Sequence, residues 1–479
     1  MAATTAPAPI AGIPQISIKP TKWIGLILAV IVCVAIIALP TPHGLTRTAQ
    51  YVLAIICLAA VLWAFQALNN GIVSVLMLGL MIIAKVRPQL VFAGFASPGF
   101  WILLCVLFYG FAMQHTGLAK RVSYYILSVF PGSYSGIMGA FFTIGLVLAL
   151  GVPSMTVRTA IMVPIAWALV KSLKLAPRSR GSALIMVTSV EMAVIPGCAV
   201  LYGSLNGPII ESMFMTKHLA LSWIAYAKVI TVPTLVLCVL LIVVNQIVLR
   251  PESKLEVSND FAKDGLSALG PFKRAELITG IVVVLSIIFW ATDRWHHLPS
   301  FLIGMLALAV FGLTGIVKDS DIGTGVSWTL LLWLGGVFSL GAIITEYKIT
   351  DWLASFMVPI AQRLTFSPLI LLLVVGVAMF LARFLDPTSL IALPVLFLPL
   401  SDVTRAAGIP PLVLTGALVL TVVPFWLSYQ HIWMAMGEGI TNNEAFDSGQ
   451  RVRLANAYAI VALVSIAISF GYWKLLHIL

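Results

Sequence analysis

The chain has 479 residues, of which 61% are hydrophobic and 9% are charged, and its mean hydropathy is +1.07. These values lie far outside the range of soluble globular domains, so the sequence is that of an integral membrane protein. The net charge of +11 is spread along the chain and forms no dense basic tract. We therefore expect no nucleic-acid partner.

The N-terminal tail, residues 1–22, is rich in Ala, Pro and Thr and has no apolar core that ends at a small-residue cleavage site. We expect no cleaved signal peptide and a cytoplasmic N-terminus. With that orientation, Lys and Arg flanking the spans are more numerous on the cytoplasmic side, as the positive-inside rule requires. The expected location is the inner, or plasma, membrane.

A membrane span needs about 20 mostly apolar residues, and eleven segments of the chain are candidates. The predicted spans are Trp23 to Leu39, Ala49 to Leu68, Ile72 to Ala84, Gly99 to Gln114, Gly181 to Met213, Trp223 to Leu249, Leu277 to Thr292, Phe301 to Ile316, Trp328 to Thr345, Leu412 to Met436 and Ala455 to Leu476. The fold class is therefore an all-α membrane protein.

Two further apolar stretches, 135–170 and 367–400, are too long for one span, and a polar segment with a proline interrupts each near its middle. Each is predicted to enter the membrane as a helix, turn, and return as a re-entrant hairpin. The expected organisation is a first half at 23–249, a hydrophilic cytoplasmic linker at 250–276, and a second half at 277–479.

The two halves resemble each other. Four residues of one span recur 227 positions later: Trp101, Leu103, Leu104 and Phe111 match Trp328, Leu330, Leu331 and Phe338. In both halves the span that begins with Trp is followed by a hairpin and then by a span that polar residues interrupt. The interruption is "LYGSLNGP" within 181–213 in the first half and "SYQHIW" within 412–436 in the second. An odd number of spans between the halves makes the repeat inverted. Inverted repeats with broken helices are typical of secondary transporters, whose substrate site lies near the bilayer midplane.

The first hairpin turns at "GVPSMTVRTAIMVP", where Ser154, Thr156 and Thr159 surround the start of the returning limb. Hydroxyl groups there cap a helix N-terminus, whose dipole favours an anion. The incoming limb ends at the same place with unpaired carbonyl groups, which suit a coupling cation. Arg158 is expected to contact a substrate carboxylate or to pair with protein, because a lipid-facing Arg is costly.

The second hairpin turns at "ARFLDPTSLIALP", where Asp386 and Pro387 are a typical helix start, followed by the hydroxyl groups of Thr388 and Ser389. Asp386 is either a helix cap or a protonatable group or cation ligand, and one carboxylate can fill both roles. Arg383 ends the limb before it, where a cavity makes its charge tolerable.

The broken spans add polar residues at membrane depth, which are tolerable only around a protein-lined or watery cavity. Gly203 and Asn206 lie in the first break, and Gln430 and His431 in the second. Glu191 precedes the first break and is interpreted as a partner of an arginine, a proton carrier or an interface residue.

These motifs make the chain resemble the divalent anion:sodium symporter family of dicarboxylate, citrate and sulfate carriers. "PSMTVRTAIMVPI" is similar to the first hairpin motif of the family, with Ser154 and Thr156 matching, and "YGSLNGPI" is similar to its first loop, with Gly203 and Asn206 matching. The resemblance implies eleven spans with two re-entrant hairpins, a homodimer, and an elevator mechanism with Na⁺ as coupling ion. Met155 stands where the family has Asn, and the second hairpin and loop depart from the family pattern.

The expected function is secondary active transport of small organic anions, by symport or exchange, with Na⁺ or H⁺ as coupling ion and no cofactor. A cation/proton antiporter is the alternative, but Arg158 and Arg383 would repel a cationic substrate. No enzyme motif such as HExxH or GxSxG is present. The predicted substrate-binding residues are Ser154, Met155, Thr156, Arg158, Thr159, Asn206, Arg383, Thr388, Ser389, Gln430 and His431. The predicted coupling-ion residues are Ser154, Gly203, Asp386 and Glu191.

Overall fold

The computed structural model describes residues 20–252, 254–255, 260–352, 355, 367–384, 386, 391–427 and 430–479. Helices make up all of the regular secondary structure in these ranges, and no strand occurs in them. Within the described ranges, eight helices are long and apolar enough to cross a membrane, and five shorter ones are also apolar. Two of these thirteen helices form the incoming limbs of hairpins, which leaves eleven. The all-helical membrane fold predicted from the sequence is confirmed.

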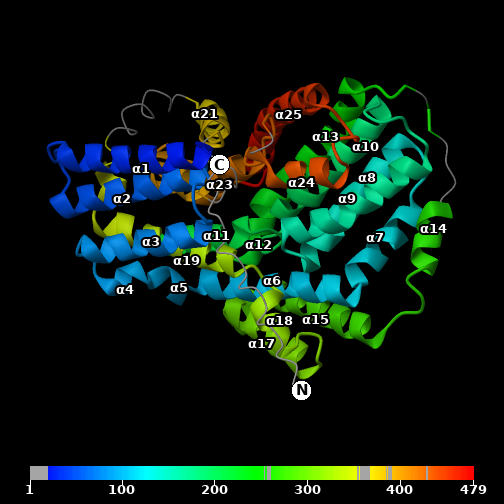
Figure 1. The fold of residues 1–479 in the computed structure, drawn as a ribbon, viewed down its shortest axis with the longest axis horizontal. Coiled ribbons are helices and arrows are strands. Elements are labelled where there is room, and N and C mark those ends of the chain that lie inside the picture. Colours follow the sequence, from blue (N-terminus) through cyan, green and yellow to red (C-terminus); the bar gives the residue numbers. More distant parts are fainter. Residues whose placement is uncertain are drawn as a thin grey trace, which may run out of the picture.

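One end of the molecule consists of N-terminal helices packed on a helix from the second half (Figure 1). The helices of this end are α1 (Pro20–Ala38), α2 (Arg47–Ala64), α3 (Asn70–Ile83), α4 (Pro88–Val91), α5 (Ala93–Ala96) and α19 (Trp328–Glu346). Small residues let them approach closely: the Ser74 hydroxyl donates to Trp333 O at 3.1 Å, and Gly94 N donates to the Ser339 hydroxyl at 2.9 Å. Such packing is typical of helices in membranes.

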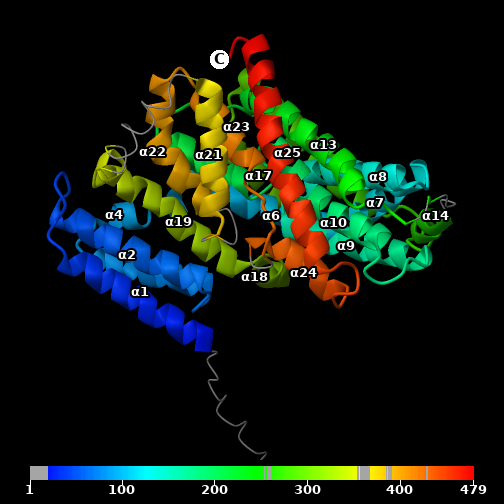
Figure 2. The ribbon, with the colours of Figure 1, turned by 90° about the horizontal axis from the view of Figure 1, so that it is seen from above.

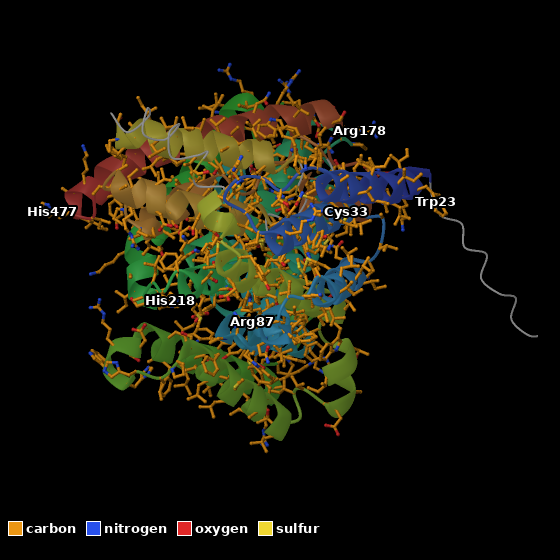
Figure 3. The ribbon with its side chains drawn as sticks, turned by 90° about the vertical axis from the view of Figure 1, so that its left-hand side faces the viewer. Trp23, Cys33, Arg87, Arg178, His218 and His477 are labelled. Carbon is orange, nitrogen blue, oxygen red and sulfur yellow. The ribbon has the colours of Figure 1, made fainter. Side chains whose placement is uncertain are left out.

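Apolar side chains cover the outer face of α1, as the view of this end shows (Figure 3). Trp23 is 52% exposed, and Ile27 and Ile31 are each 57% exposed. A soluble protein rarely leaves so large an apolar face uncovered, whereas lipid or another apolar surface is a natural neighbour for it.

A middle layer joins the two ends, and most of it lies in the lower part of Figure 1. Its helices are α6 (Pro98–Thr116), α7 (Leu118–Val129), α15 (Arg274–Ala291), α16 (Asp293–His296), α17 (Ser300–Leu313) and α18 (Asp319–Thr324). Helix α6 packs against both α15 and α17. The hydroxyl groups of Tyr109 and Ser286, which join α6 to α15, lie 2.6 Å apart.

The first hairpin and the first broken span form the other end of the molecule. The hairpin consists of α8 (Tyr134–Gly151) and α9 (Met155–Ser172), and both helices pack against α10 (Arg180–Val194). After α10 come a short 3₁₀ helix, η1 (Ile195–Ala199), an irregular stretch, and α11 (Asn206–Thr216). The next span is α12 (Trp223–Tyr226), a π-helical turn, η2 (Ala227–Thr231), and α13 (Val232–Val248).

The second half repeats this order. Its hairpin consists of α21 (Pro368–Ala382) and α22 (Ala392–Ala406), and its broken span consists of α23 (Pro411–Leu420) and α24 (Ile432–Ile440). The last helix, α25 (Ser448–Leu475), packs along α13 and α21 (Figure 2). The described limbs of both hairpins therefore belong to the same body of helices as both breaks.

Loops at one edge tie the first half to the second. Arg178 N donates to Glu444 O at 2.8 Å, and the Ser182 hydroxyl donates to Ala445 O at 2.9 Å. The Gln450 amide donates back to Arg178 O at 2.9 Å. These bonds connect the start of α10 with the turn between α24 and α25.

The predicted cytoplasmic linker contains one short helix, α14 (Asp260–Ser267), which packs on α7. Arg121 on α7 forms an ion pair with the buried Glu276 carboxylate at 3.1 Å. The same carboxylate accepts from Lys273 N at 2.8 Å and so caps the start of α15. The described part of the linker is therefore anchored to the first half of the chain.

Candidate functional site

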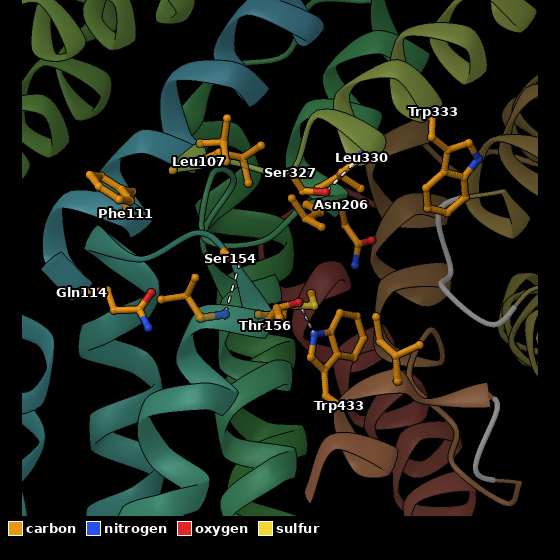
Figure 4. A pocket seen from close by; sticks show the side chains of 16 residues that line it. Leu107, Phe111, Gln114, Ser154, Thr156, Asn206, Ser327, Leu330, Trp333 and Trp433 are labelled. Atoms are coloured by element: carbon orange, nitrogen blue, oxygen red, sulfur yellow. Dashed lines mark hydrogen bonds between the residues drawn. The ribbon is translucent and has the colours of Figure 1, made fainter. Parts of the chain in front are cut away.

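A cavity of about 340 Å³ lies where the first hairpin tip meets both broken spans (Figure 4). Helices α6 and α19 close its other side. Its size falls in the range of small-molecule sites, which begins at about 300 Å³. The wall is mostly apolar, with a few converging polar groups, including the side chains of Ser154, Thr156 and Asn206.

Four helices begin at the cavity wall. Ser154 caps α9 by accepting from Val157 N at 3.3 Å, and Ser327 caps α19 by accepting from Leu330 N at 3.3 Å. Asn206 is the first residue of α11, and Ile432 is the first of α24. The backbone amides of a helix N-terminus and its dipole favour negative charge. Four such termini around one cavity give it a positive potential.

One hydrogen bond crosses the cavity between the two halves of the chain. The Trp433 indole, from α24, donates to the Thr156 hydroxyl, from the first hairpin, at 3.0 Å. Figure 4 shows the indole facing the hairpin tip. Since the Thr156 hydroxyl accepts from the indole, its own hydrogen is available to a ligand.

Arg158 lies behind the cavity wall and is fully buried. Its guanidinium donates to three carbonyl oxygens at 2.6 Å each: Val152 at the hairpin tip, Ala193 before the first break, and Gly203 within the break. They include a carbonyl group at the end of the incoming limb, where the sequence predicted that carbonyl groups would bind a coupling cation. Arg158 is therefore a structural cation of the tip, and its side chain does not line the cavity.

Arg383 has the same kind of surroundings in the second half and is also fully buried. Its guanidinium donates to Val422 O at 2.8 Å, and to the carbonyl oxygens of Asp386 and Gln430. One of these carbonyl groups belongs to the hairpin tip and two belong to the second break. Neither arginine lines the cavity, although both were predicted to bind substrate.

Glycine makes room for the Arg158 guanidinium. A Cβ added at Gly197 would lie 2.1 Å from Arg158 Nη2, and one at Gly203 would lie 2.7 Å from Gly197 O. Both contacts are shorter than real Cβ atoms tolerate. The glycines of the first break thus fit its backbone around the arginine.

Two tyrosines satisfy other backbone groups of the breaks. The Tyr226 hydroxyl donates to Cys198 O at 2.7 Å, and the Tyr458 hydroxyl donates to Leu420 O at 2.9 Å while it accepts from Val423 N at 3.0 Å. Backbone groups freed by a break at membrane depth need such partners. Sequence reasoning missed both tyrosines, because each belongs to a span that follows the break by many residues.

The remaining predicted residues fall into three groups. Ser154, Met155, Thr156 and Asn206 line the cavity, and their contact with substrate stays a prediction. Thr159, Gln430 and His431 are buried beside it, and their side chains are not part of the cavity wall. Thr388 and Ser389 lie outside the described residues.

The predicted coupling-ion residues also have different surroundings in the structure. The Asp386 carboxylate accepts from Ile391 N at 2.9 Å and from Ala392 N at 2.8 Å, which is the capping role. Glu191 bonds to Asn245 on α13, and not to an arginine. Ser154 and Gly203 are at the tip and the break, where Gly203 O accepts from Arg158.

Several cavity residues were not predicted from the sequence. Gln114 on α6, Ser327 and Trp333 on the α19 side, and Trp433 on α24 all line the wall. A Trp-led span in each half is a recognisable signal, but it does not tell which side chains face a cavity.

A family model for the sodium:sulfate symporter transmembrane region matches residues 20–479. The chain belongs to the sodium:sulfate symporter family. Its relatives include the chloroplast dicarboxylate transporter 1 of Spinacia oleracea, which is 26% identical over 418 residues that cover 85% of this chain and 72% of that protein. The L-tartrate/succinate antiporter of Escherichia coli O6:K15:H31 is 24% identical, with 88% of each chain covered.

Among solved structures, the YdaH transporter of Alcanivorax borkumensis is similar in fold, with a TM-score of 0.53 and 13% identity over 95% of this chain and 96% of that one. That identity is too low to carry anything beyond the fold. Membership of the sodium:sulfate symporter family makes the chain a multi-pass membrane transporter and not an enzyme.

Proposed function

We propose that this protein is a secondary active transporter of small organic anions, of the di- and tricarboxylate class, that exchanges one anion for another. The observation that carries the proposal is the cavity with four helix N-termini in its wall. None of the described residues that line the cavity is acidic. A carboxylate would therefore meet backbone amides and hydroxyl donors, while the buried guanidinium of Arg158 adds positive charge behind the wall.

The names of the relatives support this substrate class. One is a dicarboxylate transporter and another is a tartrate/succinate antiporter. A volume of about 340 Å³ suits a small organic acid. The alternative, a cation/proton antiporter, is disfavoured because the positive ends of the helices and both guanidinium groups would repel a cationic substrate.

The two arginines also bear on coupling. The carbonyl groups at each tip and break that would suit a sodium ion accept from Arg158 or Arg383. A guanidinium is part of the protein and cannot leave with the substrate. A core that carries buried positive charge without an anion is costly to move through an apolar surrounding, whereas an anion offsets that charge. This arrangement supports exchange without sodium.

We also propose that transport uses an elevator motion in a homodimer of the inner membrane, with the N-terminus in the cytoplasm. Both hairpins and both breaks belong to one body of helices, and the cavity lies between this body and helices α6 and α19. Sliding of such a body against its neighbours would carry a bound anion across the membrane.

Exchange in proteoliposomes tests the proposal. Vesicles are loaded with a labelled dicarboxylate, and efflux is followed after addition of unlabelled di- and tricarboxylates outside, with sodium replaced by choline in a parallel series. We expect efflux only when an external carboxylate is present, at the same rate with and without sodium. Vesicles containing the Arg158→Ala, Arg383→Ala double variant should show none.

Two outcomes would contradict the proposal. Uptake into empty vesicles that a sodium gradient drives would replace exchange by sodium symport. Movement of a metal cation against protons without any organic anion would favour the antiporter.

A further inference from the structure

Helices α10 and α13 bury a carboxyl and an amide against each other, away from the cavity wall. The Asn245 amide donates to Glu191 Oε2 at 2.6 Å and to the Thr188 hydroxyl at 3.3 Å. Glu191 is 1% exposed and Asn245 is 0% exposed. The pair lies one helical turn before the first break, where Ala193 O accepts from Arg158.

The second oxygen of each group has no hydrogen-bond partner in the described part of the chain. These atoms are Glu191 Oε1 and Asn245 Oδ1. A buried polar atom without a partner is destabilising, because it has lost its hydrogen bond to water and gained none in the protein. A carboxylate oxygen and an amide oxygen are both acceptors, so they cannot bond to each other unless a hydrogen lies between them.

We propose that Glu191 and Asn245 form a proton-binding site, in which a neutral Glu191 carboxyl donates from Oε1 to Asn245 Oδ1 while Asn245 Nδ2 donates to Glu191 Oε2. One added proton thereby gives both oxygens a partner and closes a cyclic acid–amide pair. If the amide is turned over, its oxygen faces Glu191 Oε2 at 2.6 Å, and that contact also requires a proton.

The surroundings favour a proton over a metal ion. Hard cations collect many oxygen ligands. Here Glu191 O already accepts from Ile195 N, and Asn245 O accepts from Leu249 N. No cation forms an ion pair with Glu191 in the described ranges, so nothing offsets an ionised carboxylate.

Other titratable groups surround the pair without supplying a charge partner. Cys238 on α13 and Tyr458 on α25 interact electrostatically with Glu191. The other charged or titratable side chains on elements packed against α10 are Tyr134 on α8, Arg158 and Lys171 on α9, Cys198 on η1, His431 and Glu438 at α24, and Arg451, Arg453, Tyr472 and Lys474 on α25.

This inference rests on the proposed anion exchange and specifies its pH dependence. Loss of the proton would add a negative charge to the helix body that binds the anion and would leave two buried oxygens unpaired. Substrate binding should therefore weaken as the pH rises.

Anion exchange as a function of pH provides the first test, with Glu191→Gln as the informative variant. Glutamine replaces the carboxyl O–H with an N–H that donates to Asn245 Oδ1, and keeps an oxygen that accepts from Asn245 Nδ2. We expect this variant to exchange at the wild-type rate at acidic pH and to lose the alkaline decline. The matched control is Glu346→Gln, an exposed carboxylate on α19, which should keep the wild-type profile.

Loss of exchange in folded Glu191→Gln, or a profile that still falls as the pH rises, overturns the proposal. Infrared spectroscopy of the purified protein provides a readout that does not depend on transport. We expect the carbonyl stretch of a protonated carboxylic acid in the wild type and in Glu346→Gln at a pH where exposed carboxyl groups are ionised. This band should be weaker in Glu191→Gln than in the wild type, because Glu211 is a second, largely buried carboxyl group that can contribute to it.

Absence of the band from the wild type overturns the proton site, and so does its loss when sodium is added, which would indicate a cation site. If the band is present but no anion is exchanged under any condition, the proton site stands and the proposed function fails. The two proposals can therefore fail separately.

Discussion

Arg158 and Arg383 bring their guanidinium groups to corresponding places in the two halves of the chain, but from opposite limbs of their hairpins. Arg158 is on the returning limb α9, whereas Arg383 follows directly after the incoming limb α21. Each donates to a carbonyl group of its own hairpin tip and to carbonyl groups of the following break. The two halves thus reach the same electrostatic arrangement with different sequence registers.

Removal of the Arg158 guanidinium should abolish exchange, and free guanidinium should restore part of it. In Arg158→Ala, four carbonyl groups lose a charged donor, and hydrogen bonds to charged groups contribute about 1.5 to 3 kcal/mol each. Arg158→Lys should not replace it, because one ammonium lacks the planar set of donors. Exchange is measured with and without millimolar guanidinium chloride.

The control for this rescue is Arg87→Ala, which removes an exposed arginine that is paired with Glu346. Its exchange should equal that of the wild type and should not respond to guanidinium. Equal activity of Arg158→Lys and the wild type would show that positive charge alone suffices.

The substitution Gly197→Ala should displace Arg158 without touching the cavity wall. The new Cβ would lie 2.1 Å from Arg158 Nη2 and 2.6 Å from Gly203 O. Overpacking of this kind costs about 1 to 3 kcal/mol, so both the melting temperature in detergent and the exchange rate should fall. Gly471→Ala on α25 meets nothing within 4 Å and should leave both unchanged or slightly raise stability. A wild-type melting temperature for Gly197→Ala would contradict the packing described here.

The bond between Trp433 and Thr156 should contribute to substrate affinity as a pair. Trp433→Phe and Thr156→Val each remove the 3.0 Å hydrogen bond, which is worth about 1 kcal/mol, or roughly fivefold in KM. Because either change breaks the same bond, the double variant should be little worse than the single ones. Counterflow measured over a range of substrate concentrations gives KM for the wild type and the three variants, which completes the double-mutant cycle. Fully additive effects on KM would show that the bond plays no part.

Glu252 should stabilise the start of α10 at neutral pH and lose that effect in acid. Partial burial alone would raise the pKa of its carboxyl, but hydrogen bonds from the amides of Arg180 and Gly181 prevail and hold the pKa below its ordinary value of 4.5. A lowered folded pKa means that the stabilisation is present above pH 4.5 and disappears as the pH falls through the folded pKa.

Thermal unfolding of Glu252→Gln in detergent checks this. At pH 7 we expect a loss of about 0.5 kcal/mol or less, since the side chain is 47% exposed and solvent screens it. At low pH the variant and the wild type should converge. Asp264→Asn, an exposed carboxylate of the same linker, should differ from the wild type at neither pH. A difference that grows in acid would reverse the sign and contradict the interpretation.

Hydropathy and proline positions were sufficient to predict the architecture. A span is predictable because a segment of about 20 residues that lies in lipid must be mostly apolar, and this shows in its average hydropathy. The polar segments at the hairpin tips and breaks were recognisable for the same reason, because non-helical backbone at membrane depth needs small, polar or proline residues.

Side-chain directions were not predictable in this way. Arg158 was expected either to contact the substrate or to pair with protein; carbonyl groups at the end of α10 and in the break after it turn toward the guanidinium, and only the folded chain shows this. Asn245 is one amide within an apolar span, so its pairing with Glu191 had no signal in the sequence. Thr388 and Ser389 lie outside the described residues, and their roles stay predictions.

The loop bonds that join Arg178 to Glu444 and Ser182 to Ala445 have a mechanical consequence. They link segments that lie more than 260 positions apart in the chain at one edge of the helix body. These bonds hold the segment that follows the first hairpin to the turn that follows the second broken span, so the two halves are fastened together at this edge. In the proposed elevator motion, the part of the cavity wall that the first hairpin tip and both breaks build would travel as one unit.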